Sequence, residues 1–400
     1  MITPTGTIEI REVDGEEYLA TGRAISEYAF GKSPVEPDLE TARKHRPYQA
    51  KAQNLVAFVD GDAQATLTSH EMTQNVRGAI LPMGGVASVA SMPAGRRRGI
   101  VRQLFERTFE AHRKQGLAVS TLYPFRDSFY ERLGYTNLPM TRFLTVKPEA
   151  LAPLVRMDKP GSCEQVTIAE GFDEWRSYLE RYQAGHHGFA LKHITNARRL
   201  KDENKWWVAF ARHEGDIVGA MTFQITGYGE RLVASTFYTT NSIGRYQLLD
   251  WIGRHTDQVK EAVVELQPDA YPEQWFRDLG AVVRSDHEFA WPGPMARVVD
   301  VSKLTGIGAG EGEVTLDVHD PLCPWNEGRF TFRAEEGKLV VEPGGGDATH
   351  ITIQGLSALV FTGHDPADFP FREWGEPDTA TQEALRRLFP PVIPNIHEKF

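Results

Sequence analysis

The residues with the clearest chemical potential form a basic turn, Arg96-Arg97-Arg98-Gly99. The turn follows a β-prone run at 86–91 and precedes Ile100, Leu104 and Phe105, which recur at helical spacing. This pattern predicts a strand, a tight basic loop and an amphipathic helix. The first turn of such a helix offers unpaired N–H groups and the positive end of the helix dipole, to which the arginines add charge. These groups together would bind an anion such as a pyrophosphate.

Two common phosphate loops are excluded, because neither Gly-x-x-x-x-Gly-Lys-Ser/Thr nor Gly-x-Gly-x-x-Gly occurs at this turn. Coenzyme A becomes the leading candidate for the ligand that carries this pyrophosphate. The strand before the loop would offer backbone N–H groups to its pantetheine arm. The alternative is a solvated basic turn before an ordinary surface helix. The residues expected to bind the cofactor are Val89, Ser91, Arg96, Arg97, Arg98, Gly99 and Ile100.

A second motif, Phe129-Tyr-Glu-Arg-Leu-Gly-Tyr135, follows another short β-prone run at 118–122. The order Arg-x-x-Gly, helix, strand and Phe-Tyr-x-x-x-Gly-Tyr resembles the Gcn5-related N-acetyltransferase (GNAT) superfamily. The resemblance implies that the first motif binds the pyrophosphate of acetyl-coenzyme A. It also implies that Tyr130 lies close to the thioester sulfur.

Composition limits the class of protein. A chain of 400 residues with 41% hydrophobic content predicts two to four globular domains. The formal net charge of −10 argues against a nucleic-acid partner and favours cationic small substrates. Two cysteines give neither a disulfide framework nor a zinc site, and no cluster has metal-ligand spacing. With no leader and no run of 18 apolar residues, we expect a cytoplasmic chain without a metal or a membrane partner.

Three successive patterns predict three domains. The order β-α-β-β-β-α-β up to about Leu144 matches the GNAT fold, and the stretch at 208–281 resembles 56–135 as a tandem copy. After Met295, four alternating runs separated by turns indicate an antiparallel sheet, which two helical pieces follow. Gly344-Gly-Gly346 is interpreted as a hairpin tip. We expect α/β and α+β architecture: a catalytic GNAT domain at 1–150, a degenerate GNAT-like domain at 151–294, and an α+β domain at 295–400.

The second copy lacks the residues that the reaction needs. Its loop at 239–246 holds one arginine, and Phe276, which has no hydroxyl, stands where the first copy has Tyr130. We therefore expect only the first copy to bind acetyl-coenzyme A.

The three-domain order as a whole resembles the enhanced intracellular survival (Eis) family of bacterial N-acetyltransferases, whose third domain is similar to sterol carrier proteins. The resemblance rests on Val89, the basic turn, Tyr130 and a chain that ends in Phe400. It implies acetylation of polyamines such as aminoglycosides, and a homohexamer.

The resemblance also assigns roles to residues. Tyr130 would be the general acid and the α-carboxylate of Phe400 the general base, with the C-terminal end inserted at the active site. Glu27, Tyr28 and Phe30 fall in the region that lines the amine pocket of the family. A chain end is more commonly frayed and solvated, which is the alternative for Phe400. Two other functions stay open: a non-enzymatic lipid or effector carrier, and a protein-lysine acetyltransferase.

Overall fold

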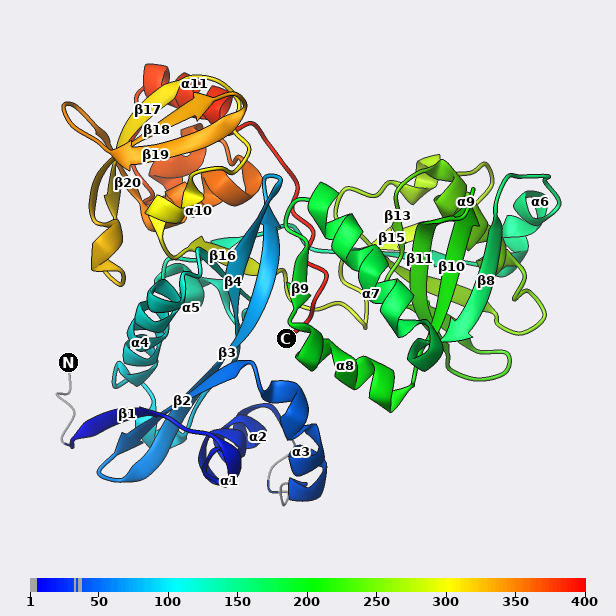
Figure 1. Cartoon of the computed structure of the whole chain (residues 1–400), viewed down its shortest axis with the longest axis horizontal. Helices are drawn as coiled ribbons and strands as arrows, with labels where there is room; N and C mark the ends of the chain where they lie inside the picture. Colours follow the sequence, from blue (N-terminus) through cyan, green and yellow to red (C-terminus); the bar gives the residue numbers. More distant parts are fainter. Residues whose placement is uncertain (1–5, 32–33, 35–37) are drawn as a thin grey trace. The chain divides into compact units, whose positions relative to one another are not determined.

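The architecture is that of a computed structural model of the chain, which describes residues 6–31, 34 and 38–400 (Figure 1). It divides into two compact units. The first unit contains residues 1–138, 187–196 and 293–400, and the second contains 139–186 and 197–292. The two units exchange chain segments, so sequence order does not follow unit membership.

The first unit is built on a mixed sheet with the strand order β1-β2-β3-β4-β5-β16-β6, and β9 pairs with the far end of β3. Strands β4 and β5 run parallel, whereas β2, β3 and β4 form antiparallel hairpins. The Asp60-Gly61 turn joins β2 to β3, in keeping with the preference of Asp-Gly for tight hairpin turns. The strands are β1 (Ile8–Glu12), β2 (Ala52–Val59), β3 (Asp62–Val76), β4 (Ala79–Ser91), β5 (Val119–Leu122), β6 (Thr136–Asn137), β9 (Ala190–Lys192) and β16 (Met295–Val298).

Helices cover this sheet and turn towards it the apolar side chains that recur at helical spacing. Helix α4 buries Ile100, Leu104, Phe105 and Phe109 against the sheet and ends at Gly116, whose φ of +77° is left-handed. The first helical region, 15–30, is interrupted by a π-helical turn, Leu19–Arg23. The helices are α1 (Gly15–Tyr18), α2 (Ala24–Phe30), α3 (Leu39–His45), α4 (Ile100–Gln115) and α5 (Asp127–Glu131), with 3-10 turns at Arg46–Gln49 and Pro93–Gly95.

Strand pairing crosses the expected domain boundaries at 150 and 294, because the first two sheets each take a strand from beyond a boundary. Strand β7 (Arg142–Val146), expected in the first domain, pairs with β14 and β15 in the second sheet. Strand β16, expected in the third domain, pairs with β5 and β6 in the first sheet. Alternation of apolar side chains identifies a strand, but it carries no information on which sheet edge accepts that strand.

The second unit repeats the plan, with the strand order β15-β7-β14-β12-β11-β10-β8 and β13 paired to β11. Its hairpin of β10 and β11 corresponds to that of β2 and β3. The strands are β8 (Ser162–Thr167), β10 (Trp207–His213), β11 (Asp216–Ile225), β12 (Arg231–Ala234), β13 (Tyr238–Thr239), β14 (Glu261–Leu266) and β15 (Val282–Arg284). The helices are α6 (Ala152–Val155), α7 (Ile168–Gly185), α8 (Ile194–Glu203) and α9 (Ser242–Gly253), with 3-10 turns at Pro148–Leu151 and Pro272–Gln274.

The C-terminal sheet has the order β19-β18-β17-β20 and packs on the apolar helix α10. Gly344–Gly346 is not a hairpin tip, because it connects β19 to β20 at opposite edges of the sheet. Strand β20 pairs parallel with β17, so the sheet is not purely antiparallel. The elements are β17 (Glu313–His319), β18 (Gly328–Glu335), β19 (Lys338–Pro343), β20 (Thr349–Thr352), α10 (Ile353–Thr362) and α11 (Thr379–Leu388), with 3-10 turns at Val301–Leu304, Pro324–Asn326 and Pro366–Arg372.

No helix within the described ranges is long and apolar enough to cross a bilayer.

Candidate active site

The basic turn forms the N-terminus of α4, as the sequence predicts. Gly99 is the N-cap with φ +75°, and Arg97 also adopts a left-handed conformation with φ +60°. A Cβ at position 99 would meet open space, so backbone conformation rather than crowding requires this glycine. Arg96 and Arg97 are exposed and Arg98 is half-buried. Ile100 is buried, so only its backbone N–H faces the turn.

A free strand edge leads into this turn, because β4 and β5 part after the pair Val86 and Leu122. The N–H of Met92 points to β3, where it donates to the Gln64 carbonyl at 2.8 Å. Since N–H groups alternate sides along a strand, the N–H groups of Ser91 and Val89 point to the unpaired edge. A β-bulge at Ser88, with φ +53°, accompanies the split. The position suits an extended polar arm such as pantetheine.

Tyr130 lies in α5 on the face of the sheet that α4 covers. Its ring packs edge-on against Phe105, Phe125 and Phe129, and it shares one core cluster with Val86. Burial raises the pKa of Tyr130 well above its usual value, so the phenol stays protonated at neutral pH. Within the described residues the hydroxyl makes no hydrogen bond.

The last residues, 390–400, form an extended segment that we call the C-terminal tail. The ring of Phe400 lies beside Gly85, where a Cβ would come within 3.2 Å of it, and packs edge-on against Tyr123 at 5.7 Å. Gly85 directly precedes Val86, the last β4 residue paired with β5. Neighbouring strand residues face opposite sides of a sheet, so Phe400 and Tyr130 approach the strand split from its two faces.

The expected amine-pocket residues lie on α2, which contacts β3 and β4. The carboxylate of Glu27 is paired with Arg23 at 2.6 Å. Tyr28 and Phe30 are 40% and 64% exposed. The structure thus places all three on one helix, and the Glu27 charge is offset by a neighbour.

Several residues at the tail were not foreseen from the sequence, among them Tyr123, Gly85 and His70. His70 lies opposite Gly85 in the β3–β4 register. Burial and the charge of Lys192 lower the pKa of His70 to about 4, against the opposing effect of Glu398, so the imidazole is neutral at pH 7. One signal existed in the sequence: glycine inside a strand indicates close approach of another group.

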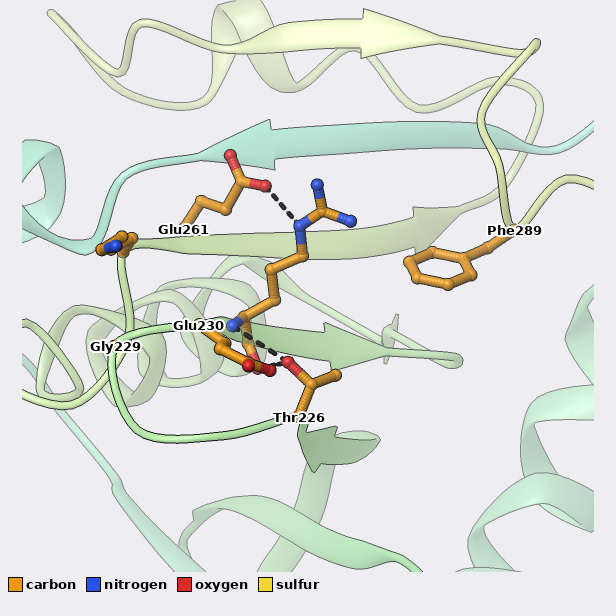
Figure 2. A pocket seen from close by; sticks show the side chains of 7 residues that line it. Thr226, Gly229, Glu230, Glu261 and Phe289 are labelled. Carbon is orange, nitrogen blue, oxygen red and sulfur yellow. Dashed lines mark hydrogen bonds and ion pairs between the residues drawn. The ribbon is translucent and has the colours of Figure 1, made fainter.

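A hollow of about 620 Å³ lies elsewhere, in the second unit (Figure 2). Arg231 projects into it and is paired with both Glu261, at 2.6 Å, and Glu288. In the second unit, Arg231 and Glu261 are the first paired residues of the parallel strands β12 and β14. In the first unit, the split lies at the other end of a parallel pair, after the last paired residues of β4 and β5. The hollow therefore does not correspond to the donor site of the first unit. Its lining is Thr226, Gly229, Glu230, Arg231, Lys260, Glu261 and Phe289.

The counterpart elements of the second unit do not rebuild the site. Its helix α9 begins after Asn241, whose side chain accepts a hydrogen bond from the N–H of Gly244 and so occupies the helix N-terminus. Phe276 lies outside any helix and packs on the core of that unit. In the described part of the chain, no group of three or more His, Cys, Asp or Glu side chains is arranged to hold a metal ion.

Comparison with known proteins identifies the chemistry. Residues 9–138 match the acetyltransferase (GNAT) domain family, and residues 301–396 match the sterol carrier protein domain family. The chain is a GNAT-type N-acetyltransferase. The GNAT match ends before β7 and the sterol-carrier match begins after β16, in accord with the strand exchange between the sheets.

Relatives share the three-part organisation of this N-acetyltransferase. An uncharacterized N-acetyltransferase of Streptomyces avermitilis is 24% identical over 79% of this chain and 84% of its own length. A probable N-acyltransferase of Enterococcus faecalis has a TM-score of 0.83 at 21% identity, covering 99% of this chain and 100% of its own. Eis1 of Mycobacterium abscessus has a TM-score of 0.74 at 17% identity, covering 98% and 100%. These structural likenesses show the fold, two GNAT-like domains and a sterol-carrier-like domain.

Proposed function

We propose that the first GNAT domain transfers an acetyl group from acetyl-coenzyme A directly to an amine bound beside it in a ternary complex. The observation that carries the proposal is the split between β4 and β5. The arginine turn lies at the end of its free edge, and Tyr130 and Phe400 flank it from opposite faces. No covalent enzyme intermediate is needed.

The basic turn would hold the pyrophosphate of the donor. The backbone N–H groups of the first turn of α4 and the guanidiniums of Arg96 and Arg97 supply hydrogen bonds and positive charge. The N–H groups of Val89 and Ser91 would receive the pantetheine arm. In that arrangement the thioester would lie at the split, between the two expected catalytic groups.

Tyr130 would act on the sulfur. Expulsion of the coenzyme A thiolate, whose parent thiol has a pKa of about 8.5, needs a hydrogen-bond donor at that atom. Because burial raises the pKa of Tyr130, the phenol is a weaker acid than a solvated tyrosine. Its main contribution is therefore a hydrogen bond that stabilises the departing sulfur.

The α-carboxylate of Phe400 would accept the proton of the attacking amine. A free α-carboxyl has a pKa of about 3.3–3.7, so it is charged but weakly basic at neutral pH. Its negative charge also attracts an ammonium group. A phenylalanine side chain anchors this carboxylate by packing on Gly85 and Tyr123.

The acceptor that the family resemblance implies is a polyamine such as an aminoglycoside, and Eis1 of Mycobacterium abscessus shares the fold. Glu27, Tyr28 and Phe30 on α2 are the residues that we assign to the amine pocket. The assay is mass spectrometry of kanamycin, spermine and a lysine peptide after incubation with acetyl-coenzyme A. Initial rates with both substrates varied give intersecting double-reciprocal lines for a ternary complex and parallel lines for an acetyl-enzyme.

The assay also separates the other functions. Acetylation of the peptide alone would indicate a protein-lysine acetyltransferase. No transfer to any amine, together with no binding of coenzyme A in calorimetry, would overturn the proposal in favour of a lipid or effector carrier.

The same resemblance carries one further proposal, assembly as a homohexamer. Composition carries another, a cytoplasmic location without nucleic-acid or membrane partners. Light scattering of the purified chain tests the first, because a monomer mass of 44.9 kDa is far from six times that value.

A further inference from the structure

The C-terminal tail is held in place although it contains no helix or strand. Its fixed points begin at Pro390, whose carbonyl oxygen accepts a hydrogen bond from Arg77 at 2.9 Å. Val392 donates its N–H to the Thr362 carbonyl at 3.1 Å, and Asn395 donates to the His187 carbonyl at 3.0 Å. A chain end is ordinarily frayed, so a chain end fixed by this series of contacts is unusual and needs an explanation.

The segment 187–192 runs beside the second half of the tail, which Figure 1 shows as the red trace next to β9. This segment lies inside the expected second domain, 151–294, but belongs to the first unit. Gly188 lies against Pro394, where a Cβ would come within 2.5 Å, and Phe189 stacks on His397 at 4.9 Å. The segment therefore guides the tail toward β4.

Lys192, at the end of this segment, contacts the residues next to the terminus. Its ammonium Nζ donates to the Lys399 carbonyl oxygen at 2.7 Å and lies 3.3 Å from Glu398 Oε2. Its backbone N–H donates to Glu398 Oε1 at 3.2 Å. The Lys192 and Glu398 side chains are only 23% and 15% exposed, so solvent screens this pair less than it screens a surface ion pair.

Tyr123 makes a second set of contacts with the end of the tail. Its hydroxyl donates to the Glu398 carbonyl oxygen at 3.1 Å, and its ring meets that of Phe400. The carbonyls of residues 398 and 399 are thus both hydrogen-bonded, and the ring of residue 400 is packed. Of the polar contacts described above, the hydrogen bond from Lys192 to the Lys399 carbonyl lies nearest along the chain to the terminal carboxylate.

We propose that Lys192 is the positioning residue for the α-carboxylate of Phe400. The inference rests on the proposed function, in which that carboxylate is the base. A base must lie within hydrogen-bond reach of the proton it takes, and small displacements are costly. A single side chain that binds both Lys399 and Glu398 fixes the direction of the final residue. The stretch of chain expected in the second domain thereby supplies a residue to the site in the first unit.

The test compares Lys192→Met with Lys192→Arg, which keeps the charge and the donors. Lys201→Met is the matched control, because Lys201 is a half-buried lysine nearby in the sequence whose ion pair is with the exposed Asp173 and whose ammonium also lies over the Phe172 ring, away from the tail. Four quantities are measured on the full chain: the rate at which carboxypeptidase A releases Phe400, the kcat, the KM for acetyl-coenzyme A, and the Tm. The first does not depend on catalysis.

For Lys192→Met we expect release of Phe400 to be at least tenfold faster and kcat at least tenfold lower. The KM for acetyl-coenzyme A and the Tm should stay near those of the parent, since the donor site and core are untouched. Lys192→Arg should recover much of both losses, and Lys201→Met should resemble the parent.

Two outcomes would overturn the inference and point to different faults. If release of Phe400 is unchanged in Lys192→Met, Lys192 does not hold the terminus, whatever the role of Phe400. If release of Phe400 is faster but kcat is unchanged, turnover does not depend on the position of the tail. The carboxylate is then not the base, and the proposed mechanism fails together with the inference.

Discussion

The guanidinium of Arg77 donates to the Pro390 carbonyl oxygen at 2.9 Å, which joins the tip of the β3–β4 hairpin to the first residue of the C-terminal tail. Arg77 also donates to the Val360 and Leu359 carbonyls at 2.8 Å each, at the C-terminal end of α10. Burial lowers the pKa of Arg77 to about 10, so it keeps its charge at neutral pH. It thereby complements the negative end of the helix dipole and fixes the C-terminal domain to the catalytic sheet.

Replacement of Arg77 should destabilise the chain. Arg77→Met removes three hydrogen bonds, two of which are to the buried carbonyls of Leu359 and Val360, so we expect the free energy of unfolding to fall by about 3 kcal/mol. Urea denaturation followed by tryptophan fluorescence measures this. The control is Arg102→Met, which removes an exposed pair with Glu106 and should cost less than about 0.5 kcal/mol. Equal midpoints for the two variants would show that Arg77 is not a structural anchor.

Removal of the Tyr130 hydroxyl should affect chemistry rather than binding. Tyr130→Phe keeps the ring contacts with Phe105 and Phe129, so we expect kcat to fall by about 100-fold with little change in affinity for acetyl-coenzyme A. Tyr135→Phe is the matched control, because its hydroxyl hydrogen-bonds Ser120 at 2.7 Å inside the core. The control should lose stability and keep turnover. Normal kcat in Tyr130→Phe would remove this residue from the mechanism.

The basic turn should bind acetyl-coenzyme A, whereas the corresponding loop of the second repeat should not. We expect Arg97→Gln to raise the Kd for acetyl-coenzyme A by about tenfold, since one charge-assisted hydrogen bond to a phosphate contributes about 1.5–3 kcal/mol. Arg245→Gln, in α9 of the second repeat, should leave the Kd unchanged, because Arg245 lies over the Tyr246 and Trp275 rings. Calorimetry measures both, and also the stoichiometry. Two donor molecules per chain would contradict a structural role for the second repeat.

Local elements were predictable from the sequence because their causes are local. The Asp60-Gly61 turn, the periodicity of α4 and the basic N-terminus of that helix each depend on residues within one or two turns. The exchange of β7 and β16 was not predictable, because it depends on which sheet edge is unpaired after the whole chain has folded. Strand β20 was missed for a related reason: its parallel partner β17 lies 30 residues or more away in sequence.

The site could be predicted in part for the same reason. Contiguous motifs led to the prediction of Arg96 to Gly99 and Tyr130 as site residues, and the family resemblance led to that of Phe400. Tyr123, Gly85 and Lys192 come from three distant segments, and only the folded tail brings them together. The spacing of residues in the sequence does not show that these three segments meet, so it does not identify the three residues as part of the site.

Acid should weaken the fold through buried histidines. Burial lowers the pKa of His187 to about 4, with its Nδ1 accepting the Arg77 N–H and its Nε2–H donating to the Phe361 carbonyl. The unfolded chain binds a proton at His187 below about pH 6.5, whereas the folded chain does so only near pH 4. The free energy of unfolding therefore falls as pH decreases from 6.5 to 4, by about 1 kcal/mol per pH unit for this residue.

Urea denaturation at several pH values tests the contribution of His187. The slope between pH 6 and 5 should be smaller in His187→Gln than in the parent by about 1 kcal/mol per pH unit, and the two slopes should agree between pH 7 and 8. Equal slopes at acid pH would mean that His187 titrates alike in the folded and unfolded chains.

Extension of the C-terminus tests the terminal base more cleanly than truncation does. Adding one alanine after Phe400 converts its α-carboxylate to a neutral amide and moves the new carboxylate about 3.5 Å farther on. The anchors at Glu398 and Lys399 stay in place, so the ring should keep its contact with Tyr123. We expect kcat to fall by 10-fold or more while the Kd for acetyl-coenzyme A is unchanged. Deletion of Phe400 is less informative because Lys399 then supplies a carboxylate one residue short. Full activity in the extended chain would show that another group takes the proton of the amine.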